Sequence, residues 1–149
     1  MTSDPELATR LRLAVTRMAR RLRQESGVVG PEISPTLTAA LATIDRCGPL
    51  TPSALAEAER IQRPTATRIV GRLEARGLVA RSADPDDGRV SFVAVTSEGR
   101  ALLKRIRSRK SEFLAKRLRQ LTPAEQATLA EAAELLERLL AEPARAPAA

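Results

Sequence analysis

Three aspartates within four residues, followed by an arginine, are the first group of side chains that could do chemistry. They are Asp84, Asp86, Asp87 and Arg89, in the stretch DPDDGR. Clustered carboxylates can bind calcium, but an EF-hand loop needs an acid or amide at its fifth place, glycine at its sixth and glutamate at its twelfth. Counted from the first aspartate, these places hold Gly88, Arg89 and Val95. The spacing does not fit a calcium loop, and we predict no metal site.

A second group of polar side chains lies in the segment RPTATRIVGRLEARG, residues 63–77. Its apolar residues follow the spacing i, i+3, i+4, i+7 of a helix face that packs on a core; they are Ala66, Ile69, Val70 and Leu73. The opposite face carries Pro64, Thr67, Arg68, Gly71, Arg72 and Ala75. Small residues allow close approach to another surface, and hydroxyl and guanidinium donors suit a DNA major groove. Taken alone, the segment could equally be a solvated helix with scattered arginines.

The composition favours a polyanionic partner and argues against catalysis. The 149 residues include 25 Lys and Arg against 18 Asp and Glu, with a formal net charge of +7, so nucleic acid is the first partner to consider. There is no His and a single Cys, which excludes Ser-His-Asp triads, histidine metal ligands and multi-cysteine zinc sites. We expect neither enzyme activity nor a cofactor.

An anionic membrane surface is the rival partner, because two segments have basic amphipathic character. These segments are RLRLAVTRMARRLR and KRIRSRKSEFLAKRLR. The stripes of the first and last predicted helices are mostly aliphatic and lack the aromatic anchors of interfacial helices, so we interpret the basic residues as a solvated face opposite a dimer stripe. The N-terminus lacks the apolar core of a signal peptide, and no run approaches the ~18 apolar residues of a membrane span. We therefore predict a cytoplasmic protein that does not bind membranes.

Capping signals and hydrophobic periodicity divide the chain into elements. Ser34, Thr51 and Thr122 each precede a proline, which is typical of a helix start, and Thr122 has Glu125 in capping-box spacing. The predicted helices span residues 5–24, 34–48, 50–60, 63–77, 96–121 and 122–142. Two short β-branched runs, 78–82 and 90–96, predict a hairpin around the loop 83–90. The aspartate cluster is the tip of this hairpin.

The core is expected to be aliphatic, because Phe92 and Phe113 are the only aromatic residues. We expect Leu37, Leu41 and Ile44 to face it. The length is that of a single domain over residues 1–149. Residues 142–149 are rich in Pro and Ala and are predicted to be a disordered tail.

The order of these elements resembles a winged helix-turn-helix, and the sequence is similar to the MarR family of transcriptional regulators. The most specific segment is GPLTPSALAEAERIQRPTATRIVGRLEARGLVARSADPDDGRVSFVAVT, and the resemblance covers nearly the whole chain. It implies a mainly α fold with a small β-hairpin wing. The DNA-binding core would span about residues 34–96, flanked by dimerisation helices at 5–24 and 97–141.

Individual positions carry this resemblance. The family's wing motif, Asp, any residue, Arg, falls on residues 87–89, and its strand-ending Leu-Thr appears as Val95-Thr96. Two positions depart from many members. Glu59-Arg60 replaces Leu-Gly in the turn before the recognition helix, and Gln62 replaces a Ser or Thr cap.

By this resemblance, residues 63–77 form the recognition helix and 83–91 the wing. The residues expected to contact DNA are Arg63, Pro64, Thr65, Thr67, Arg68, Arg72, Asp87 and Arg89. One of Arg68 and Arg72 is expected to read a guanine edge and the other to contact a phosphate. The sequence does not indicate which arginine has which role.

The wing prediction explains why acids surround an arginine on a DNA-binding loop. Arg89 is expected to enter a minor groove, with the Asp87 carboxylate paired to its guanidinium so that less rotamer entropy is lost on binding. Gly88 is expected to adopt a backbone conformation that other residues resist. Asp84 and Asp86 are interpreted as turn-forming residues. A polar loop of no functional consequence is the alternative.

Leucine stripes on the first and last helices predict a homodimer, because they are too apolar to remain exposed on a small domain. The residues expected in the interface are Leu7, Leu11, Leu129, Leu136 and Leu139. Two recognition helices would then address half-sites about one helical turn, ~34 Å, apart in a near-palindrome.

The resemblance also implies a repressor that responds to a small lipophilic or phenolic effector. The residues that would bind it are unknown from the sequence. Cys47 does not match the cysteine of the family's hydroperoxide sensors, which lies near the first helix, so we expect it to be buried as a small apolar residue. A winged-helix module that binds RNA or another protein is the alternative function.

Overall fold

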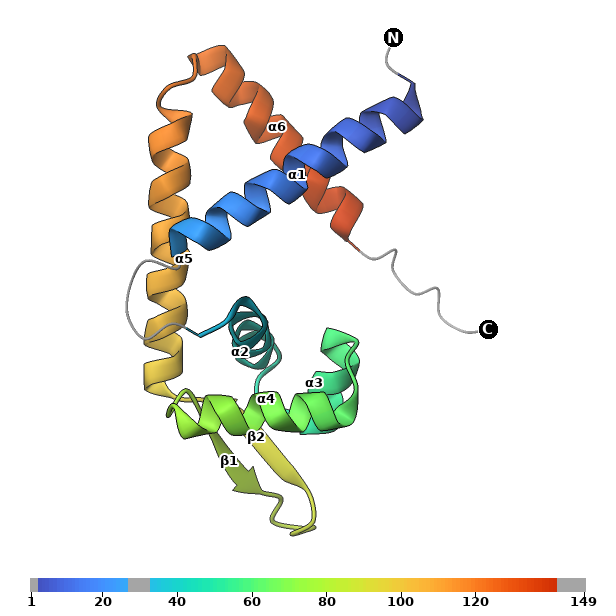
Figure 1. Ribbon diagram of the computed structural model, residues 1–149, viewed down its shortest axis with the longest axis vertical. Coiled ribbons are helices and arrows are strands. Elements are labelled where there is room, and N and C mark those ends of the chain that lie inside the picture. Colours follow the sequence, from blue (N-terminus) through green and yellow to red (C-terminus); the bar gives the residue numbers. More distant parts are fainter. Residues whose placement is uncertain (1–2, 27–32, 142–149) are drawn as a thin grey trace. The chain divides into compact units, whose positions relative to one another are not determined.

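The computed structural model describes residues 3–26 and 33–141. Within these ranges the elements are α1 (Asp4–Ser26), α2 (Pro35–Cys47), α3 (Pro52–Glu59), α4 (Arg63–Ala75), β1 (Val79–Ala83), β2 (Ser91–Val95), α5 (Ser97–Leu118) and α6 (Pro123–Leu140) (Figure 1). The chain divides into two compact units, Met1–Ser111 and Glu112–Ala149. The predicted mainly α fold with one hairpin is confirmed. The predicted tail lies outside the described residues.

The helix starts follow the predicted capping residues. The hydroxyl of Ser34 accepts a hydrogen bond from the Leu37 N–H, and that of Thr51 accepts one from the Ala54 N–H at 3.1 Å. Thr122 and Glu125 form the reciprocal capping box, in which the Thr122 backbone N–H and then its hydroxyl hold the pKa of Glu125 below its ordinary value. Local sequence therefore fixes where these helices begin.

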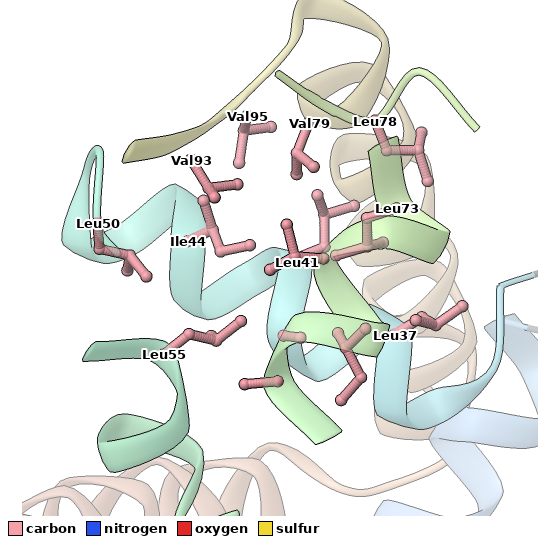
Figure 2. Close-up of a cluster of buried hydrophobic side chains, with 14 of the residues drawn as sticks. Leu37, Leu41, Ile44, Leu50, Leu55, Leu73, Leu78, Val79, Val93 and Val95 are labelled. Atoms are coloured by element: carbon pink, nitrogen blue, oxygen red, sulfur yellow. The ribbon is translucent and has the colours of Figure 1, made fainter. Parts of the chain in front are cut away.

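One aliphatic core joins α2, α3, α4 and the hairpin, with Leu103 contributed by α5 (Figure 2). The predicted core residues of α2 are all buried. The largest side chains with under 2% exposure are Leu37, Leu41, Ile44, Leu55, Val70, Leu73, Val93 and Leu103. Because burying each leucine contributes roughly 1.5–3 kcal/mol, this cluster holds the three helices and the base of the hairpin in fixed positions.

The hairpin is antiparallel, with Val79 opposite Val95 and Arg81 opposite Val93. An additional bridge extends it, which the sequence did not indicate. Leu50, between α2 and α3, exchanges backbone hydrogen bonds with Val93 at 3.1 and 2.8 Å. The inner half of the hairpin is thereby tied to the helical core.

Two tight turns set the path into and out of α4. Arg60 closes α3 in the left-handed conformation, with φ of 53°. At the other end Arg76 is the C-cap, and Gly77 follows with φ of 68°. The N–H of Leu78 donates to the Leu73 carbonyl at 3.0 Å, which is the hydrogen bond of a Schellman turn. Gly77, the last residue of the predicted helix span, is therefore the residue after the cap.

The first turn of α5 packs tightly on the base of the hairpin. The Thr96 hydroxyl donates to the Gly77 carbonyl at 2.6 Å, and the Thr96 N–H donates to the Leu78 carbonyl at 3.0 Å. Gly99 is buried here, and a Cβ on it would lie 2.2 Å from the carbonyl oxygen of Leu78. Only glycine fits at this position without a shift of backbone.

Candidate nucleic-acid interface

Helix α4 presents one buried face and one exposed face, as its periodicity predicted. Ala66, Ile69, Val70 and Leu73 are all in the core. The residues expected to contact DNA lie on the other side: Arg63, Pro64, Thr67, Arg68 and Arg72 are exposed, and Thr65 is half-buried. Packing of the apolar face therefore fixes the direction in which the arginines project.

A shallow groove of about 180 Å³ runs beside this face, between α4 and the N-terminal turn of α2. Thr65, Arg68 and Arg72 line it from α4, while Ser34 and Thr36 line it from α2. The sequence did not indicate that the two hydroxyl residues of α2 lie beside the recognition helix, because the contact is between segments far apart in the chain.

The turn between α3 and α4 adapts to the two departures from the family pattern. Arg60 takes the left-handed conformation that glycine usually supplies, and Gln62 occupies the N-cap without a side-chain capping bond. Glu59 accepts a hydrogen bond from the hydroxyl of Thr43, a buried residue of α2. This bond ties the turn to the core.

The aspartates of the wing organise its backbone. A carboxylate oxygen of Asp84 accepts from the Asp86 N–H at 2.9 Å, and one of Asp87 accepts from the Arg89 N–H at 3.0 Å. The Val90 N–H donates to the Asp87 carbonyl, also at 3.0 Å. These are the local side-chain bonds with which aspartate stabilises turns. Asp84 is therefore a turn-forming residue, as expected.

Two details of the predicted wing are wrong. The Asp87 carboxylate binds the backbone of Arg89 and not its guanidinium, which has no hydrogen bond or ion pair within the described part of the chain. Gly88 is not among the glycines with positive φ, and a Cβ there would meet nothing within 4 Å. The turn is thus held by the carboxylate, and it does not require glycine.

An ion pair links the end of α4 to the wing. The Arg81 Nε on β1 lies 3.0 Å from the Glu74 Oε2 on α4. Both side chains are partly exposed. No sequence pattern marks either residue as functional, since the pair forms only when the Gly77 turn brings the strand back along the helix.

A larger cavity of about 720 Å³ lies within the first unit, between α1, α2, α4 and α5. Its apolar lining includes Leu22, Ile33, Leu102 and Ile106. Among the residues that the structure describes, its charged lining consists of Arg23, Arg72, Arg76 and Lys110. The cavity could hold an apolar molecule that carries an acidic or phenolic group. Arg72 lines both this cavity and the groove beside α4.

The leucines predicted to lie in a dimer interface are exposed in the single chain, apart from Leu136. Leu7 is 53% exposed, Leu11 38%, Leu129 46% and Leu139 75%; Leu136 is half-buried. In the described part of α6 no residue is buried. These helices thus carry apolar faces that the described chain leaves uncovered.

Cys47 is exposed, which corrects the expectation that it is buried. It is the last residue of α2, and no described element covers its side chain at this end of the helix.

None of the described helices is sufficiently long and apolar to cross a lipid bilayer.

A compact three-helix core with a cationic helix on its surface and an arginine-tipped hairpin beside it defines a winged helix-turn-helix, a DNA-binding fold. The MarR family model matches residues 33–91. A helix-turn-helix-type transcriptional regulator of Mycobacterium bovis is 38% identical over 142 residues, covering 95% of this chain and 98% of that protein. The chain belongs to the MarR family and is a DNA-binding transcriptional regulator, not an enzyme.

Two further relatives agree with this assignment. A crystal structure of a Pseudomonas aeruginosa protein assigned as a transcriptional regulator superimposes with a TM-score of 0.84 at 36% identity, covering 96% of this chain and 99% of that one. A transcriptional repressor of Bacillus subtilis is 26% identical over 147 residues, covering 93% of this chain and 95% of the repressor.

Proposed function

We propose that this regulator is a homodimeric repressor that binds a near-palindromic operator and releases it when a small molecule binds. The observation that carries the proposal is the face of α4, where Arg68 and Arg72 project one turn apart from a helix whose other face is fully packed. A helix held in this way can present donors to base edges without reorganising.

The recognition helix supplies the major-groove contacts. Arg68 and Arg72 bind one base edge and one phosphate between them, and the first turn adds Arg63, Pro64, Thr65 and Thr67. Arg89 binds the adjacent minor groove from the wing tip, where its guanidinium makes no competing bond among the described residues. Asp87 acts through the backbone, by holding the turn that presents Arg89.

The dimer brings two such units onto one site. Leu7, Leu11, Leu129, Leu136 and Leu139 lie in the interface, where they remove from water the apolar faces that the single chain leaves exposed. Two-fold symmetry then places the recognition helices about one turn of DNA, ~34 Å, apart. Because its target is the chromosome, the protein acts in the cytoplasm.

The cavity and the named function of a relative support repression and release by a small molecule. The Bacillus subtilis relative is named as a repressor. The cavity of about 720 Å³ suits a lipophilic or phenolic effector, with Arg72, Arg76 and Lys110 near its acidic group. An effector that binds Arg72 there competes with DNA for the same guanidinium.

The direct test is binding of the purified chain to DNA from its own upstream region. We expect saturable binding at nanomolar concentration, a dimer in sedimentation, and release by members of a panel of phenolic and lipophilic molecules. Tighter binding to single-stranded RNA than to this DNA would contradict the proposal, as would a monomer at micromolar concentration that still bound the site tightly.

A further inference from the structure

The ion pair between Glu74 and Arg81 lies at the junction between the two DNA-contacting elements. Glu74 is in the last turn of α4, and Arg81 is two residues beyond Val79 on β1. Side chains two apart on a strand point to the same face. Val79 is 2% exposed and packs in the core, so Arg81 projects from that same face and reaches back to α4.

The pair lies where the hydrophobic core ends. Beyond Val79, no residue of β1 is buried. The outer half of β1 is therefore not packed on α4. Val93 of β2, opposite Arg81, is fully buried and bridged to Leu50, so the strand ladder ties the hairpin to the core at this level. The Glu74–Arg81 bond at 3.0 Å adds a direct polar restraint between β1 and the end of α4.

The contribution of this pair to folding stability is expected to be small. Both side chains are partly exposed, at 45% for Glu74 and 34% for Arg81, and exposed ion pairs contribute roughly 0–1 kcal/mol. Its charge placement is also unfavourable for DNA affinity, since Glu74 brings a carboxylate onto the DNA-binding helix. A different role explains why an acid stands there.

We propose that Glu74 is a positioning residue for DNA binding, which acts by holding Arg81 and with it the wing at the angle the operator requires. The inference rests on the proposed function, in which Arg68 and Arg72 bind the major groove while Arg89 binds the minor groove. Simultaneous contact requires a fixed offset between helix and wing tip. A restraint present before binding lowers the conformational entropy lost on binding.

The proposal and simple electrostatics predict opposite results for one substitution. Glu74→Gln removes a negative charge near DNA, so electrostatics alone predicts tighter binding. Loss of the restraint predicts weaker binding, by about fivefold, within the range of measured couplings between contacting residues. The matched control is Glu57→Gln. Glu57 is an exposed acid on α3 whose carboxylate makes no hydrogen bond or ion pair among the described residues, so its substitution should leave affinity unchanged or raise it slightly.

The Arg81 variants separate a positioning role from a direct phosphate contact. Arg81→Gln should weaken binding to the same extent as Glu74→Gln, with no further loss in the double variant. The charge swap Glu74→Arg with Arg81→Glu should recover much of the affinity. The salt dependence of binding should stay unchanged in Arg81→Gln, whereas loss of a phosphate contact would lower its slope by about one charge.

The measurements use the full-length dimer and a duplex enriched from a random-sequence pool by the wild-type protein. Anisotropy titrations over a salt series give affinity and slope, and thermal melting confirms that each variant folds. Tighter DNA binding by Glu74→Gln, or a salt slope reduced by about one charge in Arg81→Gln, would overturn this inference and leave the proposed function intact. Failure of the wild-type protein to enrich any sequence would overturn the proposed function and the inference with it.

A second measurement tests the restraint without DNA. Nitroxide labels at Ala58→Cys on α3 and Gly88→Cys at the wing tip, in a Cys47→Ser background, report the distance between core and wing. Ala58 is exposed, and a side chain at Gly88 meets open space. Diluting the labelled chain with unlabelled protein removes signals between protomers. We expect a broader distance distribution in Glu74→Gln, and an unchanged width would contradict the proposal.

Discussion

The recognition helix and the wing both present arginines, but they position them by different means. The arginines of α4 project from a helix whose opposite face lies in the core, with Ala66, Val70 and Leu73 fully buried. The wing tip buries none of its side chains, and bonds from Asp84 and Asp87 to backbone N–H groups hold its turn. Long-range packing orients the first element, and local hydrogen bonds orient the second.

The difference teaches that acidic residues can assist a DNA-binding surface. In α4 the apolar side chains provide rigidity, so no carboxylate is needed between the arginines. In the wing, where no core is available, aspartates provide it instead at the cost of negative charge near DNA. Substitutions of the groups that provide rigidity should therefore affect folding in α4, where these groups form the core, and operator affinity in the wing, where they hold only a turn.

The largest effect is expected on the buried side of α4. Leu73→Ala should lower the free energy of unfolding by about 2–5 kcal/mol, because it removes contacts and leaves a cavity in the core. Denaturant titration measures the change. Arg72→Ala, one position earlier on the exposed face, is the control and should stay within about 0.5 kcal/mol of wild type. Equal losses in the two variants would break the distinction between the faces.

On the exposed side, Arg68→Ala and Arg72→Ala should change operator binding without a change in melting temperature. Loss of the arginine that reads a base should weaken operator binding by about 1–3 kcal/mol and relax specificity at one base pair. Loss of the arginine that contacts a phosphate should weaken binding to all sequences alike. Titration against single-base operator variants assigns the two roles. If both variants bind the operator like wild type, α4 is not the recognition helix.

Arg89→Ala tests the wing contact. Loss of one cation from the interface should weaken binding and lower the slope of log affinity against log salt by about 0.9. Binding measured from low to moderate salt gives this slope. If the slope measured for Arg89→Ala equals that of the wild-type protein, the wing arginine does not bind a phosphate-lined groove.

The smallest effect on binding is expected for Asp87. It tests most directly whether local hydrogen bonds orient the wing. Its Ala variant removes the acceptor for the Arg89 N–H and should weaken operator binding by up to ~1 kcal/mol, although it removes a negative charge. Asp87→Asn keeps an acceptor oxygen and should bind at least as well as wild type. Asp86→Ala is the control, because the Asp86 carboxylate accepts no hydrogen bond within the described part of the chain. Tighter binding by a folded Asp87→Ala dimer would contradict the turn-holding role.

Periodicity and capping signals were sufficient to predict α4 and its two faces. The apolar spacing from Ala66 to Leu73 places four residues on one side of any regular helix, and the structure buries all four. The capping residues Ser34, Thr51 and Thr122 succeeded for the same reason, since their bonds connect residues three apart. Such features depend only on local geometry.

The wing and the turn show where local reasoning fails. Asp87 has two donors within reach on the same residue, and the sequence does not tell whether it binds the backbone or the guanidinium of Arg89. The backbone is favoured, since aspartate readily bonds the N–H two residues on. Arg60 was equally ambiguous, because a left-handed arginine costs roughly 1–2 kcal/mol that the hydrogen bonds closing α3 must offset.

Contacts between different secondary-structure elements were beyond prediction. The bridge from Leu50 to Val93, the Glu74–Arg81 pair and the cavity between α1, α2, α4 and α5 each join residues that no periodicity relates. Their positions follow from the packed core. The exposure of Cys47 is likewise decided by where α2 ends relative to that core.

The close contact at Gly99 makes the wing base and the start of α5 a single mechanical body. With the position of a Cβ only 2.2 Å from the Leu78 carbonyl oxygen and Thr96 bonded to Gly77 and Leu78, α5 has no room to slide or rotate there. Leu102 and Ile106, which line the cavity, follow this contact within the next two turns of α5. The same helix therefore borders the cavity and, through its first turn, supports the base of the wing.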